Sequence, residues 1–64
     1  MATKEFPELL KDLLVAEYGK TPDEAARLVK KHTNIVMNAI MSGLSFTNVR
    51  AAAMAIEMAE SEQP

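Results

Sequence analysis

Apolar residues recur every three or four positions near the start of the chain, with polar residues between them. The residues at this spacing are Phe6, Leu9, Leu10, Leu13 and Leu14. This period predicts an amphipathic helix over about 5–18. Pro7 is tolerated in a first helical turn, and Gly19 supplies the left-handed residue that commonly ends a helix. Both ends of this helix are therefore marked.

The segment 21–24, Thr-Pro-Asp-Glu, is the most specific local signal in the chain. Its threonine hydroxyl can accept from the amide of Glu24, and its proline suits the first helical position. A second helix is predicted over about 22–42. Its apolar face comprises Ala25, Leu28, Val29, His32, Val36, Ala39 and Ile40. Gly43 is expected to end it, with Leu44 folding back toward Ile40.

Ser45 is the expected cap of a third helix over about 46–60, followed by a polar tail, 61–64, that we expect to be frayed. The chain 1–64 is therefore predicted to be one all-α domain, a compact three-helix fold. Residues expected inside it are Leu9, Leu10, Leu13, Leu28, Val36, Ile40, Val49 and Ile56.

Composition narrows the function classes. The chain has 64 residues, no cysteine, 7 basic against 9 acidic side chains and a net charge of -2. A core this small has no disulfide to support it, and the charge does not favour nucleic acid. No apolar run is long enough for a membrane span, and no signal-peptide pattern is visible, so a cytoplasmic location is expected.

Charges are segregated along the chain. Residues 1–31 carry six basic and six acidic side chains, whereas Arg50 is the only charge in 32–56. The third helix is consequently apolar on two sides. Its apolar surface is larger than two short partner helices can cover. We expect the surplus to form an interface with a second copy or with another protein, because small alanines allow close approach and methionines adapt to a partner. The expected interface residues are Met37, Met41, Phe46, Ala51, Met54, Ala55 and Met58. Alternatively, the alanines are simply good helix formers and the methionines lie scattered on the surface.

His32 lies within the apolar face of the second predicted helix and has no acidic neighbour there. The favoured interpretation is a neutral core or interface histidine bonded to a backbone carbonyl or a hydroxyl. The alternative is a buried pH switch, since imidazole titrates near neutrality.

Nothing in the sequence assembles a catalytic site. One histidine, no cysteine and carboxylates spread along polar faces provide neither a nucleophile with its base nor a metal-ligand set. We expect no enzymatic activity, no cofactor, no metal and no small-molecule substrate.

Residues 39–50 resemble the turn of a helix-turn-helix DNA-binding motif, with a small residue, a turn glycine and two apolar residues at that motif's spacing. They are Ala39, Gly43, Leu44 and Val49. The resemblance implies DNA contacts by Ser45, Thr47, Asn48 and Arg50. The sequence departs from the motif at Asn38 and Ser42. The first hypothesis is therefore an interaction module that self-associates as a homodimer, and the alternative is a small DNA-binding regulator.

Overall fold

The computed structural model describes residues 5–62, and all the regular structure in this range is helical. The four helices are α1 (Phe6–Tyr18), α2 (Pro22–Lys31), α3 (Thr33–Ser42) and α4 (Phe46–Glu62). The all-α prediction is confirmed, but the structure has four helices where the sequence predicted three.

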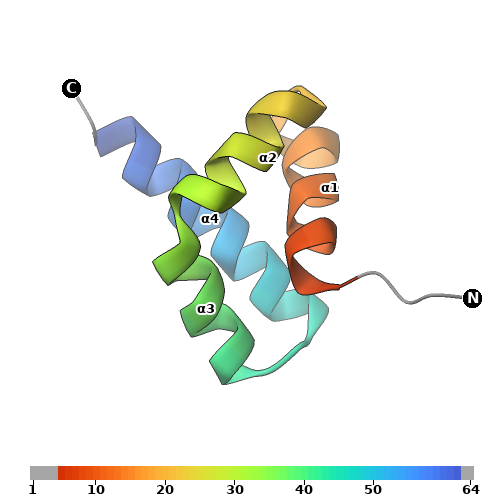
Figure 1. The fold of residues 1–64 in the computed structure, drawn as a ribbon, viewed down its shortest axis with the longest axis vertical. Helices are drawn as coiled ribbons and strands as arrows, with labels where there is room; N and C mark the ends of the chain where they lie inside the picture. The colour runs from red at the N-terminus through yellow and green to blue at the C-terminus, as the bar shows by residue number, and fades with distance from the viewer. Residues whose placement is uncertain (1–4, 63–64) are drawn as a thin grey trace, which may run out of the picture.

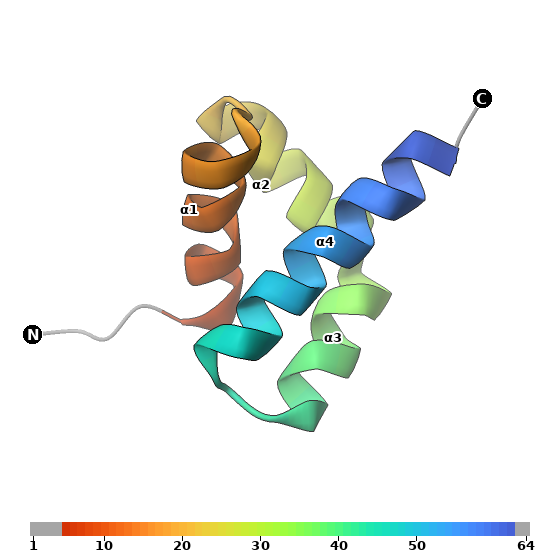
Figure 2. The same ribbon diagram turned by 180° about the vertical axis from the view of Figure 1, so that it is seen from behind.

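Helix α4 runs obliquely between α1 and α3 on one side of the molecule (Figures 1 and 2). Helix α1 packs against α2 and α4, and α3 packs against α4. The core lies where these helices meet. Its buried side chains are Phe6, Leu10, Leu13, Leu14, Ala25, Leu28, Val36, Val49, Ala52, Ala53 and Ile56. None of the described helices is long and apolar enough to cross a bilayer.

The predicted end of the first helix and the predicted start of the second are confirmed. Gly19 adopts a left-handed conformation (φ 66°, ψ 21°), and its amide donates to the carbonyl of Leu14. Thr21 caps α2, because its Oγ1 accepts from the amide of Glu24 at 3.1 Å. Both motifs satisfy backbone groups that a helix end leaves without partners.

The predicted single helix 22–42 is wrong, because the chain breaks at His32 into α2 and α3. His32 has φ -102° and ψ 45°, outside the helical region. Its carbonyl then accepts from the amides of Ile35 and Val36 and so starts the next helix. The break lets α2 pack on α1 while α3 packs on α4. A single straight helix over 22–42 could not pack against α1 with its first half and against α4 with its second half.

Three further expectations need correction. Leu9 was expected inside but is 36% exposed, because it lies at the edge of the buried face of α1 centred on Leu10 and Leu14. Ile40 is only partly buried. The tail from 61 was expected to fray, but α4 continues to Glu62; residues 63–64 lie outside the described range.

The α3–α4 connection also differs from the expected hydrophobic closure. Gly43 has φ 131° and ψ 154°, which is not the left-handed helical conformation that turns the chain back on itself. Asn48 instead donates from Nδ2 to the Gly43 carbonyl at 2.6 Å and braces the connection. Leu44 consequently projects outward, 74% exposed, rather than folding back toward Ile40.

Candidate functional site

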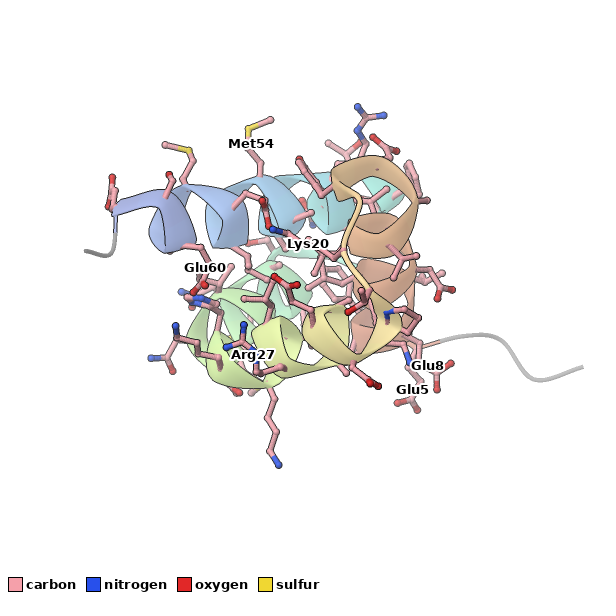
Figure 3. All side chains as sticks on the ribbon, turned by 90° about the horizontal axis from the view of Figure 1, so that it is seen from above. Glu5, Glu8, Lys20, Arg27, Met54 and Glu60 are labelled. Carbon is pink, nitrogen blue, oxygen red and sulfur yellow. The ribbon has the colours of Figure 1, made fainter. Side chains whose placement is uncertain are left out.

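The outward side of α4 carries exposed apolar residues. Met54 and Met58 are each 58% exposed, Ala51 is exposed and Ala55 is partly exposed. Met54 points away from the body of the molecule in Figure 3. These four residues, 51, 54, 55 and 58, share one side of the helix at the 3.6-residue period, and we call them the α4 stripe. The stripe itself carries no charge.

The remaining predicted interface residues lie elsewhere. Met37 and Met41 are exposed on α3, and Phe46 is exposed at the start of α4, next to Leu44 in the connection. Around α4, Phe46 lies about 80–120° from Met54 and Met58 at 100° per residue. Of the seven expected interface residues, four therefore form the α4 stripe, while Met37 and Met41 lie on α3 and Phe46 lies on another side of α4.

The expected DNA-contacting residues are mostly engaged within the protein. Ser45 Oγ accepts from the amide of Asn48 at 3.2 Å, which caps α4 as expected. Asn48 is further held by its bond to Gly43. Arg50 Nη2 lies 3.9 Å from a carboxylate oxygen of Glu17 in α1. Thr47 is exposed.

His32 forms a contact that the sequence did not reveal. Its Nε2 lies 2.7 Å from Oε2 of Glu60, and the same oxygen lies 3.0 Å from Nζ of Lys31. The expected bond to a backbone carbonyl or hydroxyl is therefore wrong. The hydrogen bond from His32, aided by Lys31, lowers the pKa of Glu60 below its ordinary value. The three residues join the α2–α3 break to the last turns of α4.

A second polar contact lies nearby on α4 (Figure 3). Lys20, in the α1–α2 connection, has Nζ 3.4 Å from Oε1 of Glu57 and 3.8 Å from Oε1 of Glu24. The other carboxylate oxygen of Glu57 is buried without a hydrogen-bond partner. This cluster ties α4 to the first connection.

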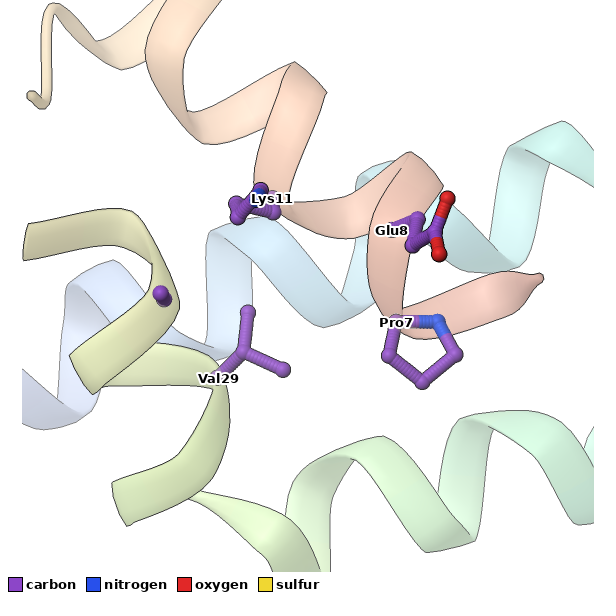
Figure 4. A pocket seen from close by; sticks show the side chains of 5 residues that line it. Pro7, Glu8, Lys11 and Val29 are labelled. Carbon is purple, nitrogen blue, oxygen red and sulfur yellow. The ribbon is translucent and has the colours of Figure 1, made fainter. Parts of the chain in front are cut away.

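The structure also has an open hollow between α1 and α2 of about 170 Å³, lined by Pro7, Glu8, Lys11, Ala26 and Val29 (Figure 4). Its polar groups, one carboxylate and one ammonium, do not form a nucleophile–base pair. Among residues 5–62, no three histidine or acidic side chains gather as metal ligands would.

No protein-family model, curated protein or solved structure matches the chain.

Proposed function

We propose that the protein is a non-enzymatic interaction module that self-associates through the α4 stripe. The observation that carries this proposal is the exposure of Met54 and Met58 at the centre of a helix face whose opposite side forms the core. Apolar residues that gather on one face of a small domain mark interaction surfaces more often than singly scattered ones do. A second copy is the simplest partner, because a two-fold axis matches the stripe with itself.

The stripe supports a weak dimer. Fully burying a methionine side chain contributes about 1.5–3 kcal/mol. Met54 and Met58 are 58% exposed, so the four methionines of a dimer would contribute roughly 3–7 kcal/mol when covered. A micromolar dissociation constant corresponds to about 8 kcal/mol, and association has its own entropic cost. The upper figure of about 7 kcal/mol corresponds to a dissociation constant of about 10 μM, so we expect a dissociation constant of tens to hundreds of micromolar.

Analytical ultracentrifugation over about 20 μM to about 1 mM tests the proposal. Wild type is expected to shift from a 7.0 kDa monomer toward twice that mass as concentration rises. Met54→Lys should remain monomeric, because the dimer would bury an unpaired charge. Ala16→Lys, at an exposed position of α1, is the matched control and should behave as wild type.

A wild type that remains monomeric at the highest concentration would refute self-association. Equal association by wild type and Met54→Lys would place the interface elsewhere. The DNA-binding hypothesis is separated by retention on a DNA column at low salt, which Arg50→Ala should then abolish. The structure favours it less, because Ser45 and Asn48 already bond within the α3–α4 connection.

A further inference from the structure

We infer that α3 is a strap that detaches from α4 as a unit, hinged at His32 and at Gly43, while α1, α2 and α4 stay packed together. This opening does not depend on the proposed self-association, because the α4 stripe lies on the outward side of α4. Three features of α3 point to it: the small surface that the helix buries, the short reach of its polar contacts and the non-helical residues at both of its ends.

Helix α3 is held by little buried surface. One of its ten residues, Val36, is buried, whereas α1 buries four of thirteen and α4 four of seventeen. Ile35, Ala39 and Ile40 pack against the core but stay partly exposed. Segments with few buried apolar contacts open at a lower free energy than the rest of a folded protein. Detaching α3 is therefore the least costly opening of the described helices.

The polar side chains of α3 do not fasten it to α4. Within residues 5–62, its side-chain hydrogen bonds run to carbonyls close along the chain: Thr33 Oγ1 donates to Lys30 at 2.6 Å, and Ser42 Oγ donates to Asn38 at 3.1 Å. The helix also carries no charged residue with which α4 could form an ion pair. The hold of α4 on α3 is therefore apolar along the length of the helix.

The residues that bound α3 are placed as hinges. His32 precedes it with φ -102° and ψ 45°, and Gly43 follows it with φ 131° and ψ 154°, so the chain is non-helical at both points. Hinges are a few residues at the ends of elements that absorb changes in φ and ψ. Each is latched to α4 by one hydrogen bond: His32 Nε2 with Glu60 at 2.7 Å, and the Gly43 carbonyl with Asn48 Nδ2 at 2.6 Å. The latches hold the ends of the strap, and Val36 holds its middle.

The other three helices keep their packing when α3 leaves. Helix α1 packs against both α2 and α4, and α3 lies to one side of them, next to α4 (Figures 1 and 2). The contacts of Lys20 with Glu57 and of Glu17 with Arg50 also join α4 to the first part of the chain. Opening therefore uncovers the side of α4 on which α3 lies and leaves α1, α2 and α4 as a folded unit.

Amide hydrogen exchange followed by NMR tests the strap, because a helix of ten residues is barely stable in water once it has lost its partner. We expect the amides of 37–42 to share one opening equilibrium. Their protection should be at least about tenfold lower than that of the core amides of Leu14 and Ile56. Low urea should change the exchange of 37–42 little, because detaching α3 exposes less surface than global unfolding. All samples are measured at one protein concentration, since self-association also alters protection.

Two variants separate the opening of α3 from unfolding of the whole domain. Thr21→Ala removes the cap of α2, a contact that is kept when α3 detaches, so the core amides should lose about fivefold in protection while 37–42 stay unchanged. Asn48→Ala removes the latch at Gly43 and should lower the protection of 37–42 by about two- to tenfold. Thr47→Ala, at the neighbouring exposed position, is the matched control and should exchange as wild type.

Three outcomes would overturn the strap. Equal protection of 37–42 and the core amides, with a common loss in Thr21→Ala, would show that the domain opens only as a whole. Protection that declines steadily from 37 to 42 would show fraying from one end rather than detachment as a unit. Unchanged exchange of 37–42 in Asn48→Ala would show that the strap has no hinge at Gly43.

Discussion

Ala53 offers a sharp test of how closely α4 is packed. It is 0% exposed and lies on the side of α4 that meets the core. Replacing it by leucine adds three carbon atoms where no space is left. Such overpacking costs about 1–3 kcal/mol, because neighbouring side chains must leave their preferred rotamers or the helix must shift. Leucine is nearly as good a helix former as alanine, so intrinsic propensity contributes little to this cost.

The cost is large for a domain of this size. At about 0.05–0.15 kcal/mol per residue, a domain of 64 residues is expected to have a stability of about 3–10 kcal/mol. An unfolding entropy of about 2.1 cal/mol/K per residue converts each kcal/mol into about 7–8 °C of melting temperature. Ala53→Leu should therefore lower the melting temperature by roughly 7–24 °C.

The assay is thermal unfolding followed by far-ultraviolet circular dichroism. All variants must be measured at one protein concentration, because self-association makes the melting temperature concentration-dependent. Ala16→Leu, at an exposed position of α1, is the matched control and should melt within a few degrees of wild type. Equal melting of Ala53→Leu and Ala16→Leu would show that Ala53 is not enclosed and that α4 sits differently on α1 and α3.

Two further predictions concern helix ends. Thr21→Ala removes the oxygen that accepts from the amide of Glu24, so it should cost about 1 kcal/mol in a urea titration; an unchanged midpoint would show that this cap does not stabilise α2. The pKa of Glu60 lies below its ordinary 4.5 in the folded state, so its contribution to stability is present above that pH and is lost as pH falls through the lower folded value. Glu60→Gln should make stability depend less steeply on pH in this acidic window, and an unaltered slope would contradict the contact with His32 and Lys31.

Local signals along the chain predicted most of the helix ends. The segment 21–24, the helix-ending Gly19 and the capping Ser45 all function in the structure as the sequence indicated. Each of these helix ends depends on hydrogen bonds between residues a few positions apart, so the local sequence is enough to predict it. The overall helical content follows from the same signals.

The break at His32 could not be predicted in this way. Apolar positions continue through it at helical spacing, and no glycine or proline marks it. Its polar partner, Glu60, lies 28 residues further along the chain. Only the packing of α2 on α1 and of α3 on α4 requires the bend, and this competition between partners is a property of the folded molecule.

The sequence also did not show which alanines of α4 are buried and which are exposed. Ala51 is exposed while Ala52 and Ala53 are buried, yet alanine is tolerated equally in both environments. The sequence did indicate an apolar surplus on this helix, and Met54 and Met58 are indeed exposed. It did not show how Met37 and Met41, on α3, lie relative to α4, because the relative placement of the two helices depends on the connection between them.

Only one residue, His32, separates α2 from α3, so the number of residues between these two helices is tightly constrained. One residue inserted there would change the direction and rotation of α3 relative to α2, because only His32 separates the two helices. Val36 would then turn away from α4, and no slack in the backbone could absorb the change. The three-residue connection 43–45, whose Leu44 points outward, has room for such an insertion. We therefore expect insertions and deletions to be tolerated between α3 and α4 but to detach α3 from α4 when placed between α2 and α3.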